Sequence, residues 1–299
     1  MKTPKANDYV EVVLKNNNKA LSTHFKAHVM AIKAPIQLGL DGEIRNVIED
    51  ICNGASTVKS DHLVVFIVTT GGYIEVVERI YGVFRKHFKK VSFVVPDYAY
   101  SAGTVLVLSG DEIYMDYYSV LGPIDPQIEN TDGKSVPGLG YLAKFDELAK
   151  RINSDKAGDA TRAELAYLVK KFDPATLFLL EQAKNHSSSL LVEWLSKHKF
   201  KDWTKTEGTG KKVTDQMRKD RAKQVASILG NAERWHSHGR GIGLKELTSD
   251  EIKLKIVDFG GDPDLNKKIR NYYDLFIDFS HKSGARSAIH TELGFRRLQ

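Results

Sequence analysis

Residues 63–95 read LVVFIVTTGGYIEVVERIYGVFRKHFKKVSFVV, and this stretch decides the fold. Leu63–Val68 is a continuous apolar run with three valines, too short for a helix and without alternation, which predicts a strand buried on both faces. From Tyr73 to Phe88 apolar residues recur every three or four positions, which predicts a helix with one apolar face. Val91–Val95 predicts a second buried strand, so the stretch is a right-handed βαβ unit.

The same alternation continues on both sides of this unit. Downstream, Ala102–Leu108 predicts a compact apolar helix and Glu112–Met115 the next strand. Upstream, His28–Ile32 and Gly42–Ile51 fit an earlier strand and helix. Residues from about 25 to 125 therefore describe a layered α/β core.

After Gln127 the pattern changes to mainly helical. Asp173-Pro174 predicts a helix start, because it combines an N-cap acceptor with a proline at the first helical position. Thr248–Glu251 fits a capping box that opens a short helix, and Ile256-Val257 follows it. The expected organisation has five parts. An N-terminal extension (1–24) precedes the core (25–128) and a mainly helical portion (129–230). A segment returning to the core (231–260) and a C-terminal helix and tail (261–299) follow.

The composition limits the class of protein. The chain has 299 residues, 41% hydrophobic and 27% charged, with a net charge of +6 and a single cysteine, Cys52. One cysteine excludes an intramolecular disulfide and a zinc site built on several thiolates, and it fits a reducing compartment. No stretch approaches the ~20 apolar residues of a membrane span, so we expect a cytoplasmic, soluble protein. The basic stretch Lys199–Lys223 favours an exposed loop entering a helix over nucleic-acid binding.

Two glycine-containing turns follow successive strands, where open parallel sheets place their ligands. The second turn carries Ser101, and the N–H of Ala102 starts the helix behind it. Gly71-Gly72 in the first turn offers a second N–H close to a substrate. A serine beside two converging N–H groups has the parts of an acyl-transfer site with an oxyanion hole. Spacing alone leaves open that Ser101 caps its helix and that Gly103 serves packing.

Four motifs in order resemble the Clp-fold serine peptidases. The closest likeness is to the serine-dehydrogenase-proteinase (SDH) type, which is related to SppA and ClpP. The resemblance covers about residues 60–128 and resumes more loosely over Trp235–Phe259. It rests on Thr70-Gly71-Gly72, on Tyr100-Ser101-Ala102-Gly103-Thr104, on Asp111-Glu112-Ile113, and on Ser119-Val120-Leu121-Gly122-Pro123-Ile124-Asp125-Pro126-Gln127.

The resemblance implies a Clp/crotonase-like α/β fold with an inserted or appended helical portion. It also implies a serine endopeptidase that cleaves peptide bonds through an acyl-enzyme on Ser101. Gly72 and Ala102, supported by Gly71, would form the oxyanion hole. Such folds assemble into rings or other closed oligomers, so a homo-oligomer acting on a peptide or protein is expected, with no cofactor.

The general base is the open point of this resemblance. ClpP places a histidine about twenty-five residues after its nucleophile, where this chain has Ile124-Asp125-Pro126 and no histidine nearby. The likeness to SppA implies a lysine, which acts as a base when burial lowers its pKa. Lys144 is our first prediction, because it lies on a predicted helix with apolar neighbours, and Lys134 is the alternative.

A serine–histidine pair is the second choice. His236 and His238 are the rivals of the lysines, because the acidic member of the ClpP triad precedes the equivalent late helix. Two histidines at this spacing also suggest a metal, but no third ligand is evident and no metal site is predicted.

Two other functions fit the same motifs. A crotonase-like enzyme would use the paired N–H groups to hold the enolate of a coenzyme A thioester and would need no serine nucleophile. A non-catalytic member of the fold would bind a peptide or partner without cleaving it, and the missing ClpP-type histidine favours this alternative.

Overall fold

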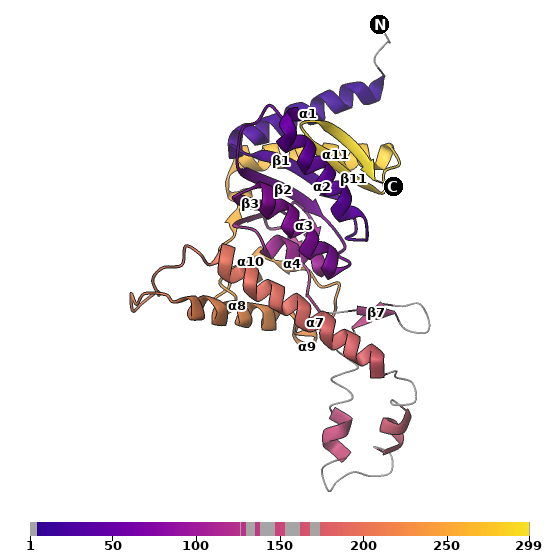
Figure 1. The fold of residues 1–299 in the computed structure, drawn as a ribbon, viewed down its shortest axis with the longest axis vertical. Helices are drawn as coiled ribbons and strands as arrows, with labels where there is room; N and C mark the ends of the chain where they lie inside the picture. Colours follow the sequence, from indigo (N-terminus) through magenta and orange to yellow (C-terminus); the bar gives the residue numbers. More distant parts are fainter. Residues whose placement is uncertain are drawn as a thin grey trace.

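The computed structural model describes residues 5–125, 127–129, 135–137, 147–152, 162–167 and 174–298. Its centre is a seven-stranded sheet in the order β10-β5-β3-β2-β1-β11-β12 (Figure 1). Neighbouring strands from β10 to β1 run parallel, and β11 and β12 are added antiparallel. The strands are β1 His28–Lys33, β2 His62–Val68, β3 Lys90–Val94, β5 Glu112–Met115, β10 Val257–Asp258, β11 Ser287–Thr291 and β12 Gly294–Leu298. The predicted α/β class is confirmed.

The packing of strand β2 explains why polar and apolar residues do not alternate in its sequence. Leu63, Val65 and Ile67 pack into the core on one face of the sheet. Val64 and Phe66 pack into the core on the other face. Because helices cover both faces, the positions of β2 from Leu63 to Val68 are all apolar.

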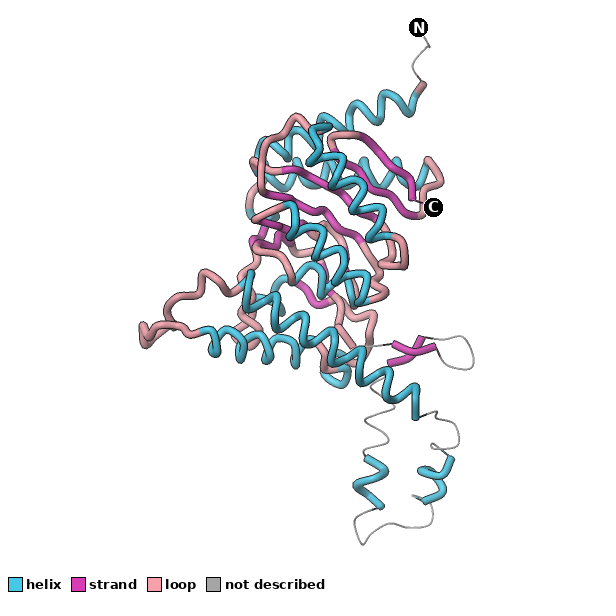
Figure 2. The backbone as a smooth tube through the Cα atoms, in the orientation of Figure 1, coloured by secondary structure: helices cyan, strands magenta, loops and turns pink. Residues whose placement is uncertain are grey.

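Helices cover the two faces of the sheet as separate layers (Figure 2). One layer contains α2 Leu40–Asp50, α3 Ile74–His87 and α4 Ala102–Leu108. The other contains α1 Ala6–Phe25 and α11 Pro263–Lys282.

The helical portion lies beside α3 and α4 (Figure 1). Trp194 of its first long helix stacks on Tyr81 of α3 with ring centroids 4.2 Å apart, and His186 Nε2 lies 3.2 Å from Glu78 Oε2. The elements are α7 Pro174–Trp194, the π-helical turn η2 Leu195–Lys199, α8 Asp215–Leu229, α9 Ala232–Trp235 and α10 Leu244–Thr248, with residues 147–152 and 162–167 also helical. The helix start predicted at Pro174 is confirmed.

Short elements complete the chain. A two-stranded hairpin is formed by β7 Gln127–Glu129 and β8 Ser135–Pro137. A π-helical turn, η1 Ile51–Ala55, follows α2, and a 3₁₀ turn, η3 Phe259–Gly261, precedes α11. Within the described residues, no helix combines the length and the apolar character needed to cross a membrane.

The capping box predicted at Thr248–Glu251 is wrong. Helix α10 ends at Thr248 instead of beginning there. The Thr248 hydroxyl donates to Leu244 O at 2.8 Å, and the Ser249 hydroxyl donates to Glu246 O at 2.7 Å. These hydroxyls bond back to carbonyls of the last helical turn, so the same residue types mark a helix end here.

Candidate active site

A small second sheet joins three distant parts of the chain. It consists of β4 Tyr98–Ala99, β6 Val120–Leu121 and β9 Ile242–Gly243, in that order. Strands β6 and β9 are antiparallel, with Leu121 opposite Ile242. Continued for four residues, this register brings Asp125 opposite His238. Ser101 follows β4 by two residues, so one sheet anchors all three segments.

Ser101 occupies a strained turn between β4 and α4. Its backbone has φ 53° and ψ −120°, a region that residues other than glycine rarely adopt. It stands at the N-cap position of α4, but its side chain makes no capping bond. Among the described residues no hydrogen-bond partner of its hydroxyl is found, so the oxygen is available to a ligand.

Glycines allow the turn with Ser101 to pack this closely. A Cβ on Gly71 would lie 2.5 Å from Tyr100 O and 2.8 Å from Ser101 Cβ, and its φ is 91°. On the other side of the turn, a Cβ on Gly122 would lie 2.5 Å from the Tyr100 ring. A Cβ on Gly103 would lie 2.3 Å from Thr69 Cγ2, so this glycine serves helix packing. A side chain at Gly71 would therefore displace the turn that carries Ser101.

The N–H groups of Gly72 and Ala102 are available at the same place. Ile36 N donates to Gly71 O at 2.8 Å, and Tyr73 N donates to Ile36 O at 2.9 Å. These two bonds flank Gly72, so its own N–H points to the opposite side of the strand. Ala102 is the first residue of α4, where an N–H has no intrahelical acceptor.

His238 and Asp125 form the polar pair of the site. His238 Nδ1 lies 2.8 Å from Asp125 Oδ1, and the Asp125 side chain is 1% exposed against 21% for His238. An ionised carboxylate only accepts hydrogen bonds, so Nδ1 carries the proton and Nε2 is the acceptor. This is how an orienting acid prepares a histidine base.

One cavity of 610 Å³ contains the predicted nucleophile and this pair. Its walls include Ser101, Gly71, Gly72, Ala102, Asp125 and His238. Ile74, Val105 and Ile124 make part of it apolar, and Ala183 and Ser187 of α7 close one side. Apolar walls with a few convergent polar groups are typical of ligand sites.

The four residues predicted as candidate bases differ in whether they line the cavity and whether the structure describes them. His236 is exposed, with φ 60°, and does not line the cavity, whereas His238 does. Lys134 and Lys144 lie outside the described residues. Asp125 was not predicted as a site residue, although the resemblance placed Ile124-Asp125-Pro126 in the region where ClpP has its histidine. Nothing in the sequence pairs Asp125 with His238, and the two residues meet through the register of β6 and β9.

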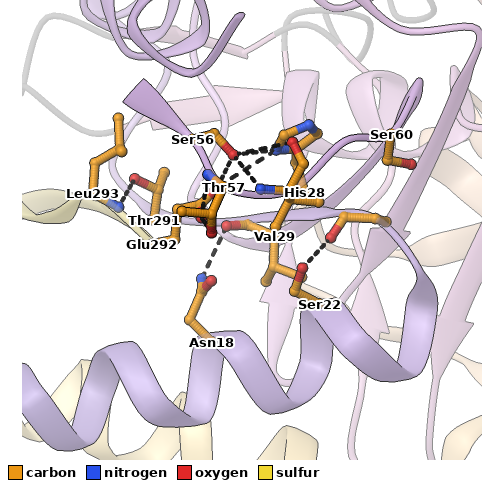
Figure 3. Close-up of polar contacts among 12 residues, drawn as sticks. Asn18, Ser22, His28, Val29, Ser56, Thr57, Ser60, Thr291, Glu292 and Leu293 are labelled. Carbon is orange, nitrogen blue, oxygen red and sulfur yellow. Dashed lines mark hydrogen bonds and ion pairs between the residues drawn. The ribbon is translucent and has the colours of Figure 1, made fainter. Parts of the chain in front are cut away.

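A second serine, histidine and carboxylate meet at the opposite end of β1 (Figure 3). Ser56 Oγ lies 3.3 Å from His28 Nδ1 and also contacts Glu292 Oε1. Glu292 is 3.6 Å from the same ring nitrogen. Because both groups approach Nδ1, the histidine does not stand between acid and serine as catalysis requires. This cluster ties the β11–β12 turn to β1 and is structural.

In the described part of the chain, no set of three or more His, Cys, Asp or Glu side chains gathers as a metal site would require.

Part of the chain matches a known protein family. Residues 45–161 match the model of the family described as ClpP-like SDH-type serine proteinase. The match covers less than half of the chain. The matched segment includes β2, Gly71, Gly72, Ser101 and Asp125, and the predicted resemblance is confirmed.

Two curated relatives come from Methanocaldococcus jannaschii. The uncharacterized protein MJ0137 is 29% identical over 163 residues, which is 54% of this chain and 51% of the relative. The uncharacterized protein MJ1495 is 29% identical over 120 residues, 33% of this chain and 41% of the relative. The chain thus spans about half the length, or less, of these relatives.

Solved structures with lower similarity were also found. A mutant of the 1510-N membrane-bound stomatin-specific protease in complex with a substrate peptide has a TM-score of 0.44 and 13% identity, covering 77% of this chain and 74% of its own. ClpP1 from Listeria monocytogenes has a TM-score of 0.38 and 9% identity, covering 80% of this chain and 96% of its own.

Proposed function

We propose that the chain is a serine peptidase in which Ser101 is the nucleophile, His238 the general base and Asp125 the acid that orients the base. The observation that carries this proposal is the shared cavity. It brings a serine whose hydroxyl has no partner among the described residues together with a histidine already hydrogen-bonded to a buried carboxylate.

The chemistry follows from these positions. Ser101 Oγ attacks the peptide carbonyl carbon while His238 Nε2 takes the hydroxyl proton. The carbonyl oxygen becomes an oxyanion, which accepts hydrogen bonds from the N–H groups of Gly72 and Ala102. When the C–N bond breaks, His238 returns the proton to the leaving amine. Water, deprotonated by the same histidine, then hydrolyses the acyl ester and restores Ser101.

Asp125 has a positioning and electrostatic task in this scheme. It accepts the Nδ1 proton of His238 and stabilises the imidazolium that forms during attack. Its burial makes this interaction strong, because little water competes for the carboxylate.

Lys144 remains the rival base from the sequence. The pairing of His238 with Asp125 leads us to rank His238 first, and substitution separates the two. Lys144→Met removes the amine and keeps the bulk of the side chain, whereas His238→Gln removes the base proposed here. Loss of reactivity in Lys144→Met with reactivity kept in His238→Gln would reverse the ranking.

The first prediction is covalent labelling of Ser101. A fluorophosphonate probe should modify the protein at Ser101, and Ser101→Ala should abolish labelling without unfolding the chain. His238→Gln should lower the labelling rate at least about 1000-fold. Labelling is measured by intact-mass and peptide mass spectrometry.

Ser56→Ala is the matched control, because Ser56 also has a histidine and a carboxylate beside it but lies in the structural cluster of Figure 3. It should label like the wild type. Label on Ser56, or equal labelling of Ser101→Ala, would show that the site is misassigned. Absence of labelling would favour the crotonase-like or non-catalytic alternatives. The closed homo-oligomer stays a prediction, checked by light scattering.

A further inference from the structure

The C-terminal end of α8 contacts the segments of both proposed catalytic partners. Leu229 O accepts a hydrogen bond from Ile124 N at 3.1 Å, directly before Asp125. The preceding carbonyl, Ile228 O, accepts the indole N–H of Trp235 at 2.8 Å, three residues before His238. The last carbonyls of a helix have no intrahelical donor, so they can accept hydrogen bonds from other segments. Ile228 O also accepts a hydrogen bond from Asn231 N at 3.3 Å, so the indole shares this carbonyl with the chain that leaves the helix.

Trp235 is well placed to fix the loop with His238. Its side chain is 4% exposed. The guanidinium groups of Arg234 and Arg240 lie 5.1 Å and 5.8 Å from its ring, so cations from both ends of the loop meet the same indole. Between them the chain turns back, with Arg240 N donating to Ser237 O at 3.1 Å.

We infer that Trp235 is a positioning residue: through its hydrogen bond to Ile228 O, the end of α8 holds His238 in register with Asp125. This inference rests on the proposed function and gives α8 a task in it. The carbonyls of residues 228 and 229 are consecutive, so any movement of the helix end displaces acid and base segments together. The hydrogen bond from the Trp235 indole N–H to Ile228 O keeps His238 from moving independently of Asp125.

The test removes only the N–H donor. Trp235→Phe keeps an aromatic ring, and 3-benzothienylalanine at position 235 keeps the full indole shape with sulfur in place of N–H. The His238 Nδ1–H proton, detected in protein with ¹⁵N-labelled histidine and assigned by its loss in His238→Gln, reports the pair directly. We expect this resonance to weaken or shift in both variants, and labelling of Ser101 to slow about tenfold.

The chain offers matched controls in its other two tryptophans. Trp203→Phe also replaces an indole with a phenyl ring, but on the loop before α8, away from His238. It should leave the Nδ1–H resonance and the labelling rate of Ser101 unchanged. Trp194→Phe disturbs the stacked, buried contact with Tyr81 and controls for loss of stability. An unchanged Nδ1–H resonance in the folded benzothienyl variant would overturn the inference. Because this resonance needs no catalysis, a chain that labels nowhere would refute the proposed function and leave the positioning test intact.

Discussion

At the scale of single residues, Gly72 sets the geometry of the proposed oxyanion hole. A Cβ at this position would lie 2.1 Å from Ile36 O, and the backbone φ is 146°. Gly72→Ala must therefore push the turn away from Ile36 and move the N–H assigned to the oxyanion. We expect the labelling rate of Ser101 to fall about 100-fold or more. The melting temperature, measured in parallel, checks that the variant remains folded.

Gly82 provides the control for this substitution. It lies within α3, and nothing stands within 4 Å of a Cβ built on it. Gly82→Ala should stabilise the fold by roughly 0.5–1 kcal/mol, because alanine has the higher helix propensity, with labelling unchanged. Wild-type labelling in a folded Gly72→Ala variant would remove Gly72 from the oxyanion hole.

Some residues of the candidate site could be predicted from the sequence, and others could not. Gly71, Gly72 and Ser101 could be predicted because each marks a turn directly after an apolar strand. Asp125 could not, because a carboxylate before a proline is ordinary in a surface loop. Its role depends on a partner 113 residues away.

At the scale of elements, Thr104 fastens the start of α4 to the segment that leads to Asp125. Its hydroxyl is fully buried, lies 2.8 Å from Ala99 O and 2.9 Å from Gly122 O, and accepts from Gly122 N at 3.0 Å. Thr104→Val keeps the shape and leaves these groups without their partner. We expect a loss of about 1–3 kcal/mol in the free energy of unfolding, measured by chemical denaturation.

Thr248→Val is the corresponding control. The Thr248 hydroxyl bonds to Leu244 O in an exposed position at the end of α10, where water can replace it. Its stability change should stay within about 0.5 kcal/mol. Equal effects of the two substitutions would mean that the buried hydroxyl does not fasten the turn.

Elements with strong periodicity were predictable, and short ones were not. The strands of the βαβ unit and helix α4 follow from apolar runs that match their periods. Strands β4, β6 and β9 have two residues each, too few for any period, yet their register brings the site together. The pairing of His238 with Asp125 was missed because these strands are so short.

At the scale of the whole molecule, the C-terminal tail completes the central sheet. Strands β11 and β12 extend it beyond β1, and α11 shares a core with α1. The tail was expected to be a helix with an extension. Its strand Ser287–Thr291 contains a fully buried histidine, His290, which weakens the apolar pattern.

Histidines with lowered pKa values make the stability of the whole molecule sensitive to acid. Burial lowers the pKa of His28 and His62, and it lowers the pKa of His198 to about 4 and of His290 to about 3. In the unfolded chain these side chains titrate near 6.5. Above that pH both states are neutral, and the packing of these histidines contributes fully.

Below pH 6.5 the unfolded chain binds protons that the folded chain excludes, so the free energy of unfolding must fall as the pH falls. The fall continues until each folded-state pKa is reached, down to about 4 for His198 and about 3 for His290. Between pH 7.5 and 5 the buried His290 should remove up to about 2 kcal/mol, and the half-buried His198 should remove less because solvent screens its charge. Both effects are measured by chemical denaturation at the two pH values.

His198→Gln tests this assignment, because glutamine can accept the Tyr81 hydroxyl bond made by His198 Nε2 at 2.8 Å but does not titrate. The variant should lose less stability than the wild type between pH 7.5 and 5, while their difference at pH 7.5 reports packing alone. The pKa of Asp111 is lowered from its ordinary value near 3.8 to about 2. This carboxylate therefore changes the free energy of unfolding in a separate, more acidic pH range. A wild-type stability that is flat from pH 7.5 to 5 would show that the folded protein accepts these protons and that the histidines are not held neutral by burial.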